Sequence, residues 1–255
     1  MVSNHGTGKL RGFRAYFPKA LKFFDLKDDR LAPIVFSIVL FANLLGIFLQ
    51  GPTDGSDIAD KITPSTIPLY ILMNIITKLA LSVYLAACIK EMKGEVYSLK
   101  SCVDLVLKRS LRILAASVVY TLFTTVLIVI LTLSGLFYLA IPILVIYIMY
   151  QFNTCYIVDR NYGIIASFKA SRKVTSGYKW RIFVLTLIFT VVLIFISMMI
   201  LGVFVTSGSA LIYSFVIYFM LSLFNMMNEK LIALLYYDLE YGAFEIEKKL
   251  KDDEF

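Results

Sequence analysis

Long apolar runs alternate with polar connections along the chain, and six of these runs have the length of a membrane-spanning helix. A helix needs about 20 predominantly apolar residues to cross the hydrocarbon core of a bilayer. We therefore expect an all-α integral membrane bundle, a single domain over residues 1–255 with a cytoplasmic N-terminal segment (1–30), a six-span bundle (31–237) and a charged tail (238–255). The predicted transmembrane helices are residues 31–50, 67–89, 113–134, 136–158, 182–205 and 210–237.

The connections between the runs predict how the helices pair. Little more than "SG" separates the third run from the fourth, and "TSGS" separates the fifth from the sixth. Connections this short join antiparallel neighbours in helix bundles. Together with a longer connection at residues 51–66, they predict three helical hairpins that pack against one another.

The basic residues predict the orientation of the bundle. Residues 1–30 contain seven Lys and Arg, residues 90–112 and 159–181 contain six each, and residues 229–255 contain four. The three connections on the other side contain one, Lys61. Because basic loops stay on the cytoplasmic side, we expect a multi-pass protein of the bacterial cytoplasmic membrane with both termini in the cytoplasm. The net charge of +7 is then an orientation signal, and we expect no nucleic-acid binding.

Amphipathic helical patterns precede the first, third and fifth runs. Before the third run, for example, charged residues recur every fourth position from Lys100 to Arg112, and apolar residues lie on the other face. A helix of this kind lies in the membrane interface with its apolar face towards the acyl chains. We therefore expect interfacial helices before spans 1, 3 and 5. The side chains expected to contact anionic lipid head groups are Lys169, Arg172, Lys173, Trp180, Arg181, Lys100, Lys108 and Arg112.

Lys78 is the most unusual residue of the apolar runs, because it lies near the centre of the second run. A lysine at this depth costs about 2.5–3.5 kcal/mol on insertion scales, so by default it marks a functional site or a paired charge. Glu229 lies at a comparable depth in the sixth run, and Asn74 and Asn225 precede the two charges by one helical turn. One hypothesis is a Lys78–Glu229 contact within a small polar interior. The alternative is that Lys78 extends towards the cytoplasm and Glu229 lies near the head groups.

The fourth run and the loop after it carry a recognisable motif. Pro142 opens the run, and the loop has the form D-x-x-x-G-I-x-x-S-x-x-x-S, followed by a small, an aromatic and a basic residue. With the C-terminal sequence "LLYYDLEYGAFEIE", this motif resembles the YciC-like family of uncharacterised multi-pass bacterial membrane proteins, which is related to the membrane domain of some glycerophosphoryl diester phosphodiesterases. The resemblance implies six spans and carries over no catalytic residues. The matching positions of the loop are Asp159, Gly163, Ile164, Ser167, Ser171, Gly177, Trp180 and Arg181.

The side chains that intramembrane catalysis requires are sparse. The only histidine, His5, lies in the N-terminal tail, and no aspartate lies within an apolar run. A nucleophile activated by histidine, or a pair of buried aspartates, is therefore not available within the bundle. We expect a protein without enzymatic activity, metal or cofactor.

Three functions remain open at the level of sequence. The leading one is to bind or move a lipid or an amphipathic solute in membrane or envelope homeostasis. The second is an interaction protein, either a subunit of a complex or homo-oligomer or an immunity protein that shields the membrane. The third is a small-solute transporter or channel that uses the Lys78 region. A continuous cavity of lipid width that opens sideways between spans would favour the first. An apolar groove or a bound partner helix would favour the second, and a closed aqueous cavity at Lys78 the third.

Overall fold

The computed structural model describes Leu10 and residues 12–50, 67–134, 140–205 and 210–242, and this part of the chain is all-helical, with turns between the helices. The helices, in chain order, are α1 (Phe13–Leu21), α2 (Leu31–Gln50), α3 (Ile67–Met92), α4 (Leu99–Ser134), α5 (Ala140–Tyr150), α6 (Asn153–Arg160), α7 (Ile164–Thr175), α8 (Lys179–Val205) and α9 (Ala210–Glu240).

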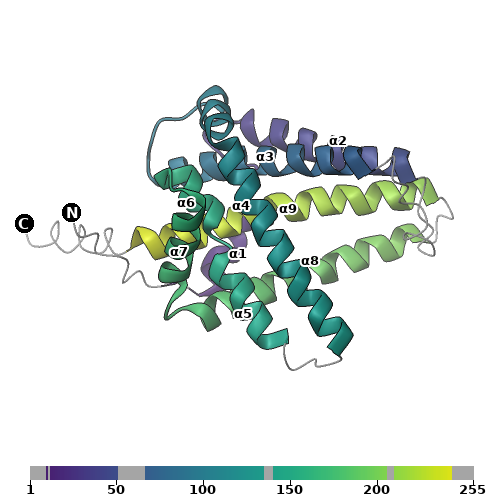
Figure 1. The fold of residues 1–255 in the computed structure, drawn as a ribbon. Coiled ribbons are helices and arrows are strands. Elements are labelled where there is room, and N and C mark those ends of the chain that lie inside the picture. The colour runs from purple at the N-terminus through teal and green to yellow at the C-terminus, as the bar shows by residue number, and fades with distance from the viewer. Residues whose placement is uncertain (1–9, 11, 51–66, 135–139, 206–209, 243–255) are drawn as a thin grey trace, which may run out of the picture.

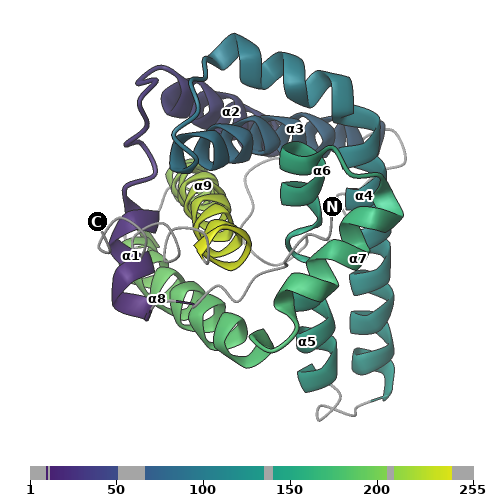
Figure 2. The same ribbon diagram turned by 90° about the vertical axis from the view of Figure 1, so that its left-hand side faces the viewer.

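Helix α9 is the centre of the bundle. It contacts α1, α2, α3, α7 and α8. Seen along its axis, α2 and α3 lie on one side of α9 and α8 on the other (Figure 2). The helices α2, α3, α8 and α9 run alongside one another, whereas α4 and α5 diverge from them (Figure 1). The short helices α1, α6 and α7 gather at the end of the bundle where α9 terminates.

Within the described residues, three helices are long and apolar enough to cross a membrane: α3, most of α8 (Lys179–Gly202) and most of α9 (Leu211–Glu240). In α2, Leu31–Leu45 forms a shorter apolar helix. The surface of these helices is apolar as well. In α8, for example, Phe195 and Met198 are each 65% exposed. Apolar surface of this extent is unfavourable in water and favourable against acyl chains. The described residues therefore form a helical membrane protein, and six spans in three hairpins remain a prediction.

The predicted fourth span, residues 136–158, is not one continuous helix. In its described part, α5 and α6 lie on either side of a turn at Gln151 and Phe152. Ser171 of α7 stabilises this break, because its hydroxyl donates to the Met149 carbonyl (2.7 Å) and accepts from the Phe152 N–H (3.2 Å). Backbone groups released by a broken helix need such partners in an apolar environment. The break cannot be predicted from the apolar sequence of this run, because the side chain that stabilises it belongs to another helix.

Replacing Ser171 with Ala is expected to lower the free energy of unfolding by about 1–3 kcal/mol, because a buried N–H and a buried carbonyl lose their partner. Ser167 is the matched control, since it is equally buried on α7 but bonds to the Ile164 carbonyl of its own helix (2.7 Å). Unfolding in mixed detergent micelles can be followed by the fluorescence of Trp180, the single tryptophan. Equal losses for S171A and S167A would contradict a specific role of Ser171 at the break.

Two of the three predicted interfacial helices are separate elements. These are α1 and α7, and α7 begins directly after Gly163. The chain turns after α7 at Gly177, whose φ of 89° lies in the left-handed region that favours glycine. The third predicted interfacial helix is not separate. Its residues form the first turns of α4, which continues without interruption for 36 residues.

The face on which α7 packs also differs from the prediction. We expected its apolar side chains to lie on the acyl chains. In the structure α7 contacts α5 and α6, and its buried side chains are Ser167, Ser171 and Thr175. Phe168 and Val174, two apolar side chains of α7, pack partly against the protein core. Ser171 bonds to the backbone at the break between α5 and α6, whereas the hydroxyls of Ser167 and Thr175 bond to carbonyls of α7 itself.

Candidate functional site

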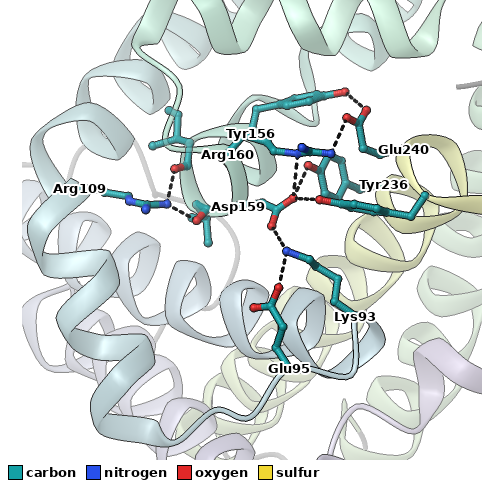
Figure 3. A network of polar contacts seen from close by, with 11 residues as sticks. Lys93, Glu95, Arg109, Tyr156, Asp159, Arg160, Tyr236 and Glu240 are labelled. Carbon is teal, nitrogen blue, oxygen red and sulfur yellow. Dashed lines mark hydrogen bonds and ion pairs between the residues drawn. The ribbon is translucent and has the colours of Figure 1, made fainter. Parts of the chain in front are cut away.

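Asp159, near the end of α6, is the centre of a charged cluster (Figure 3). Its side chain is only 5% exposed, and Oδ1 lies 3.1 Å from Nζ of Lys93, directly after α3. Oδ2 accepts hydrogen bonds from Tyr236 of α9 (2.8 Å) and from Tyr241 just beyond α9. Nε of Arg160 lies 3.6 Å from the same oxygen. One buried carboxylate therefore connects the ends of α3, α6 and α9.

Glu240 adds a second anionic centre to the cluster. Its Oε1 lies 3.2 Å from Nη2 of Arg160, and its Oε2 accepts a hydrogen bond from the hydroxyl of Tyr156 (2.7 Å). The ring of Tyr241 lies 5.1 Å from the guanidinium carbon of Arg160 and 5.6 Å from Nζ of Lys93. Both distances are within the range of cation–π attraction. The end of α9 is thus held by ionic, hydrogen-bonded and aromatic contacts together.

Two arginines of α4 hold the end of α6 from the other side. Arg109 donates from Nη1 to the carbonyls of Ile157 (3.0 Å) and Val158. Arg112 donates to the side chain of Asn161 (3.1 Å), which ends α6 in the left-handed conformation with φ of 56°. The last carbonyls of a helix lack partners within the helix, and basic side chains satisfy them. Arg112, which we predicted to face lipid, contacts Asn161 directly after α6 and remains exposed.

The electrostatics of the cluster keep its hydrogen-bond donors protonated. Burial lowers the pKa of Lys93, but the hydrogen bonds to Glu95 and Asp159 outweigh burial, so the pKa is raised above its ordinary value. Burial and the hydrogen bond to Asp159 both raise the pKa of the Tyr241 phenol. Both groups therefore remain donors at neutral pH. With the oxygens of Asp159 occupied by these donors, the arrangement suits a connection between helices better than proton transfer to a substrate.

Lys78 and Glu229 come together between α3 and α9. Nζ of Lys78 lies 3.8 Å from Oε1 of Glu229, and the two side chains are 28% and 12% exposed. Of the two sequence hypotheses, this geometry corresponds to the contact and not to separated side chains. Both residues lie within helices that are long and apolar enough to cross a membrane. An ionised group in such a segment is costly unless it has a partner.

The two asparagines of the predicted polar site lie one turn before these charges. Asn74 is exposed, and its Nδ2 donates to the Tyr70 carbonyl of α3 (2.8 Å). Asn225 is half-buried on α9. A further polar contact, which the sequence did not predict, joins Nδ2 of Asn43 in α2 to the hydroxyl of Ser222 in α9 (2.9 Å). Polar contacts of this kind between apolar helices favour one packing over others.

The remaining residues predicted to face lipid are on the surface. Lys100 and Lys108 are exposed on α4, and the basic residues of α7 are exposed on the side away from its buried serines. At the start of α8, Arg181 is exposed, and Trp180 is 61% exposed with an edge contact to Phe183 (5.7 Å). These positions suit a tryptophan and basic residues at the level of the head groups. The exposed basic residues of α7 are Lys169, Arg172 and Lys173.

An apolar groove of about 480 Å³ lies between α8 and α9. Its walls are almost entirely apolar, with Leu193 and Ile200 on α8 and Val216 and Phe224 on α9, and Leu21 of α1 also lines it. The volume is within the range of about 300–1,000 Å³ that small-molecule sites occupy. Because both walls belong to helices of membrane-spanning character, the groove suits an acyl chain or another apolar group.

Helix α9 presents different chemistry on its two faces. Six polar residues between Ser214 and Glu240 follow one another at spacings that are sums of three and four, so they share one face. The buried Lys230 and Asp238 lie outside this face. The residues that line the groove lie on the opposite face. The polar face meets α2 and α3 through Ser222 and Glu229, and it ends in the Asp159 cluster. Residues of the polar face are Ser214, Ser222, Asn225, Glu229, Tyr236 and Glu240.

Most of the Asp159 cluster was missed by sequence reasoning. We identified Asp159 as part of the family motif but gave it no partner. Tyr236 and Glu240 did have a sequence signal, because they continue the polar spacing of α9 beyond Glu229. Lys93 and Arg109 had no such signal, since each is one of several basic residues in its segment.

Comparison of the chain with protein-family models, curated proteins and solved structures finds no match. The geometry of the described residues is therefore the basis of the functional argument.

Proposed function

We propose that this chain is a non-enzymatic six-span protein of the bacterial cytoplasmic membrane that binds or moves a lipid or an amphipathic solute. In this proposal the spans are α2, α3, the second half of α4, the segment 136–158 that contains α5 and most of α6, α8 and α9, and both termini are cytoplasmic. A role in membrane or envelope homeostasis follows from such an activity. The resemblance to the YciC-like membrane proteins agrees with this location and adds no activity.

The groove between α8 and α9 is the observation that carries the proposal. It is nearly devoid of polar atoms, and its walls are two helices that can cross a membrane. An occupant of such a groove must be apolar over the length that contacts Leu193, Ile200 and Val216. The molecules of this kind most abundant in a membrane are lipids, which makes an acyl chain the expected occupant.

The basic surface at the end of the bundle where α9 terminates supports the same function. Lys169, Arg172 and Lys173 project from α7, and Lys108 projects from α4. Each Lys or Arg near an anionic membrane surface contributes about 1 kcal/mol of attraction. Together with Trp180, these residues hold the protein at the head-group level and raise the local concentration of anionic lipids.

A tryptophan in the groove tests the proposal. We expect V216W to reduce the amount of lipid that co-purifies in mild detergent roughly threefold or more, because the indole occupies volume in which acyl carbon atoms would make their contacts. Native mass spectrometry of the purified protein, with quantification of extracted lipids, gives the number of lipids retained per chain. The matched control is V191W, the same substitution at a position on α8 that is 55% exposed and does not line the groove.

The possible outcomes distinguish lipid binding in the groove from lipid binding elsewhere and from the absence of lipid binding. Loss of lipid in V216W but not in V191W supports the groove as the site. Equal retention in both variants shows that lipid binds elsewhere and removes the groove from the proposal. A wild-type protein that retains no lipid under conditions that preserve its fold overturns the proposed function.

A further inference from the structure

The contact between Lys78 and Glu229 is long for a pair of opposite charges inside an apolar bundle. Their separation of 3.8 Å exceeds the 2.7–2.9 Å that is typical of charge-assisted hydrogen bonds. An ammonium group has three donors, and a carboxylate has about four acceptor positions. The pair therefore neutralises its charges while much of its hydrogen-bonding capacity remains.

The pair is also accessible from the side of the bundle. Lys78 is 28% exposed, and Asn74, one turn away on α3, is exposed. The helices α3 and α9 run in the same direction (Figure 1). Asn225 therefore lies on the same side of the charge pair along α9 as Asn74 does along α3. An ammonium, a carboxylate and two carboxamides thus occupy two neighbouring turns.

A ligand can reach one end of the polar face of α9 more easily than the other. On the cytoplasmic side, α6 packs against α3, and the Asp159 cluster closes the bundle. Towards the other end of α3 the surface is apolar and exposed, with Ile71 56% and Leu72 50% exposed. A molecule in the membrane can therefore approach the charges with its apolar part remaining among acyl chains.

We propose that Asn74, Lys78, Asn225 and Glu229 form a second ligand site, which takes the zwitterionic head of an amphipathic molecule. The phosphate or carboxylate of the ligand lies beside Lys78, its ammonium lies beside Glu229, and the two carboxamides supply further donors and acceptors. The site is distinct from the α8–α9 groove, because it lies on the opposite face of α9.

Charge complementarity selects a zwitterion over a simple ion. A purely anionic head group gains Lys78 but meets the Glu229 carboxylate at nearly the same distance. A purely cationic one gains Glu229 but meets the ammonium. Only a molecule that carries both charges a few ångströms apart satisfies both side chains without leaving one charge unpaired in an apolar environment. The 3.8 Å separation leaves each partner able to turn towards the ligand.

The test compares two lipids with identical acyl chains. Phosphatidylethanolamine, which is zwitterionic, and phosphatidylglycerol, which is anionic, are supplied in equal amounts to the delipidated protein in mild detergent, and bound lipids are counted by native mass spectrometry. The basic residues of α4 and α7 attract phosphatidylglycerol in every variant, so the preference is measured as the ratio of bound phosphatidylethanolamine to bound phosphatidylglycerol and is compared between variants. We expect this ratio to be higher in the wild type than in a protein without the charge pair. We expect the double variant K78M/E229M, which removes both charges and leaves none unpaired, to lose about tenfold of that preference, which is typical for the loss of a hydrogen bond to a charged group. The groove variant V216W should bind less lipid in total and keep the preference.

Two results overturn the inference. Either the ratio of bound zwitterionic to bound anionic lipid is the same in the wild type and in K78M/E229M, or V216W lowers this ratio as much as the double variant does. If K78M/E229M does not accumulate, N74L/N225L leaves the charges in place and is expected to lower the preference severalfold, and an unchanged preference in that variant also overturns the inference. Retention of lipid without selection leaves the proposed function intact, so the two proposals fail separately.

Discussion

Replacing Asp159 with Ala is expected to lower the free energy of unfolding by about 3 kcal/mol. Removing one partner of a buried ion pair costs about 3–5 kcal/mol, because the remaining charge is left uncompensated. The carboxylate is 5% exposed, but Lys93 and Arg160 are 25% and 41% exposed and can recover some hydration, which places the loss near the lower end. The hydroxyls of Tyr236 and Tyr241 lose their acceptor at the same time.

The fluorescence of Trp180 reports unfolding in mixed detergent micelles, and thermal aggregation in detergent gives an independent measure. The matched control is D104A, which removes an exposed aspartate from α4 and is expected to change stability by less than about 0.5 kcal/mol. In the variant D159N, the charge is removed and the shape is retained, so the tyrosines keep an acceptor and the loss should be smaller than in D159A. A loss in D159A no greater than that in D104A would show that the cluster does not stabilise the fold.

Replacing Lys78 with Met is expected to have an effect of similar size, about 3 kcal/mol, because Glu229 is left as a nearly buried charge without a counter-ion. The double variant K78M/E229M is expected to regain most of this stability. Replacing a buried ion pair by apolar side chains of similar volume is often neutral or stabilising. In a double-mutant cycle measured by the same unfolding assay, the double variant should therefore lose less stability than the sum of the two single variants, which shows that the two positions are coupled.

The control for this cycle is K90M, the same substitution on the same helix, where Lys90 is half-buried in the last turn of α3. We expect K90M to have a small effect and no coupling to Glu229. If K78M alone has no more effect than K90M, Lys78 reaches water without the help of Glu229, as the alternative hypothesis from the sequence holds.

Lys78 and Glu229 show what sequence reasoning can supply in a membrane protein. A charge in the middle of an apolar run needs a partner, and few residues of opposite charge lie at the same depth. The partner could therefore be named without knowing which helices touch. The same reasoning did not give the 3.8 Å separation or the exposure of the pair, because both depend on how closely α3 and α9 pack.

The Asp159 cluster shows where such reasoning ends. Its segments contain many Lys, Arg, Asp, Glu and Tyr residues near a surface, where water can satisfy any of them. The depth of a residue in the membrane therefore does not reduce the number of ion pairs that are possible in these segments. Lys93 and Asp159 are 66 positions apart, and their contact requires that α6 turn back against α3. This change of direction requires the break at Gln151, and Ser171 of α7 stabilises that break.

The sequence by itself determined the all-helical membrane character, because runs of apolar residues must form helices when no water is present to bind the backbone. It also indicated which end of the bundle is basic, and it identified the charged residues within the apolar runs, which require partners. Only the tertiary structure decided where a long apolar run breaks, which of the basic residues hold a neighbouring helix, and that the two faces of α9 carry a groove and a polar site. These features depend on contacts between helices distant in the chain, and an apolar run has the same appearance whichever helix it packs against.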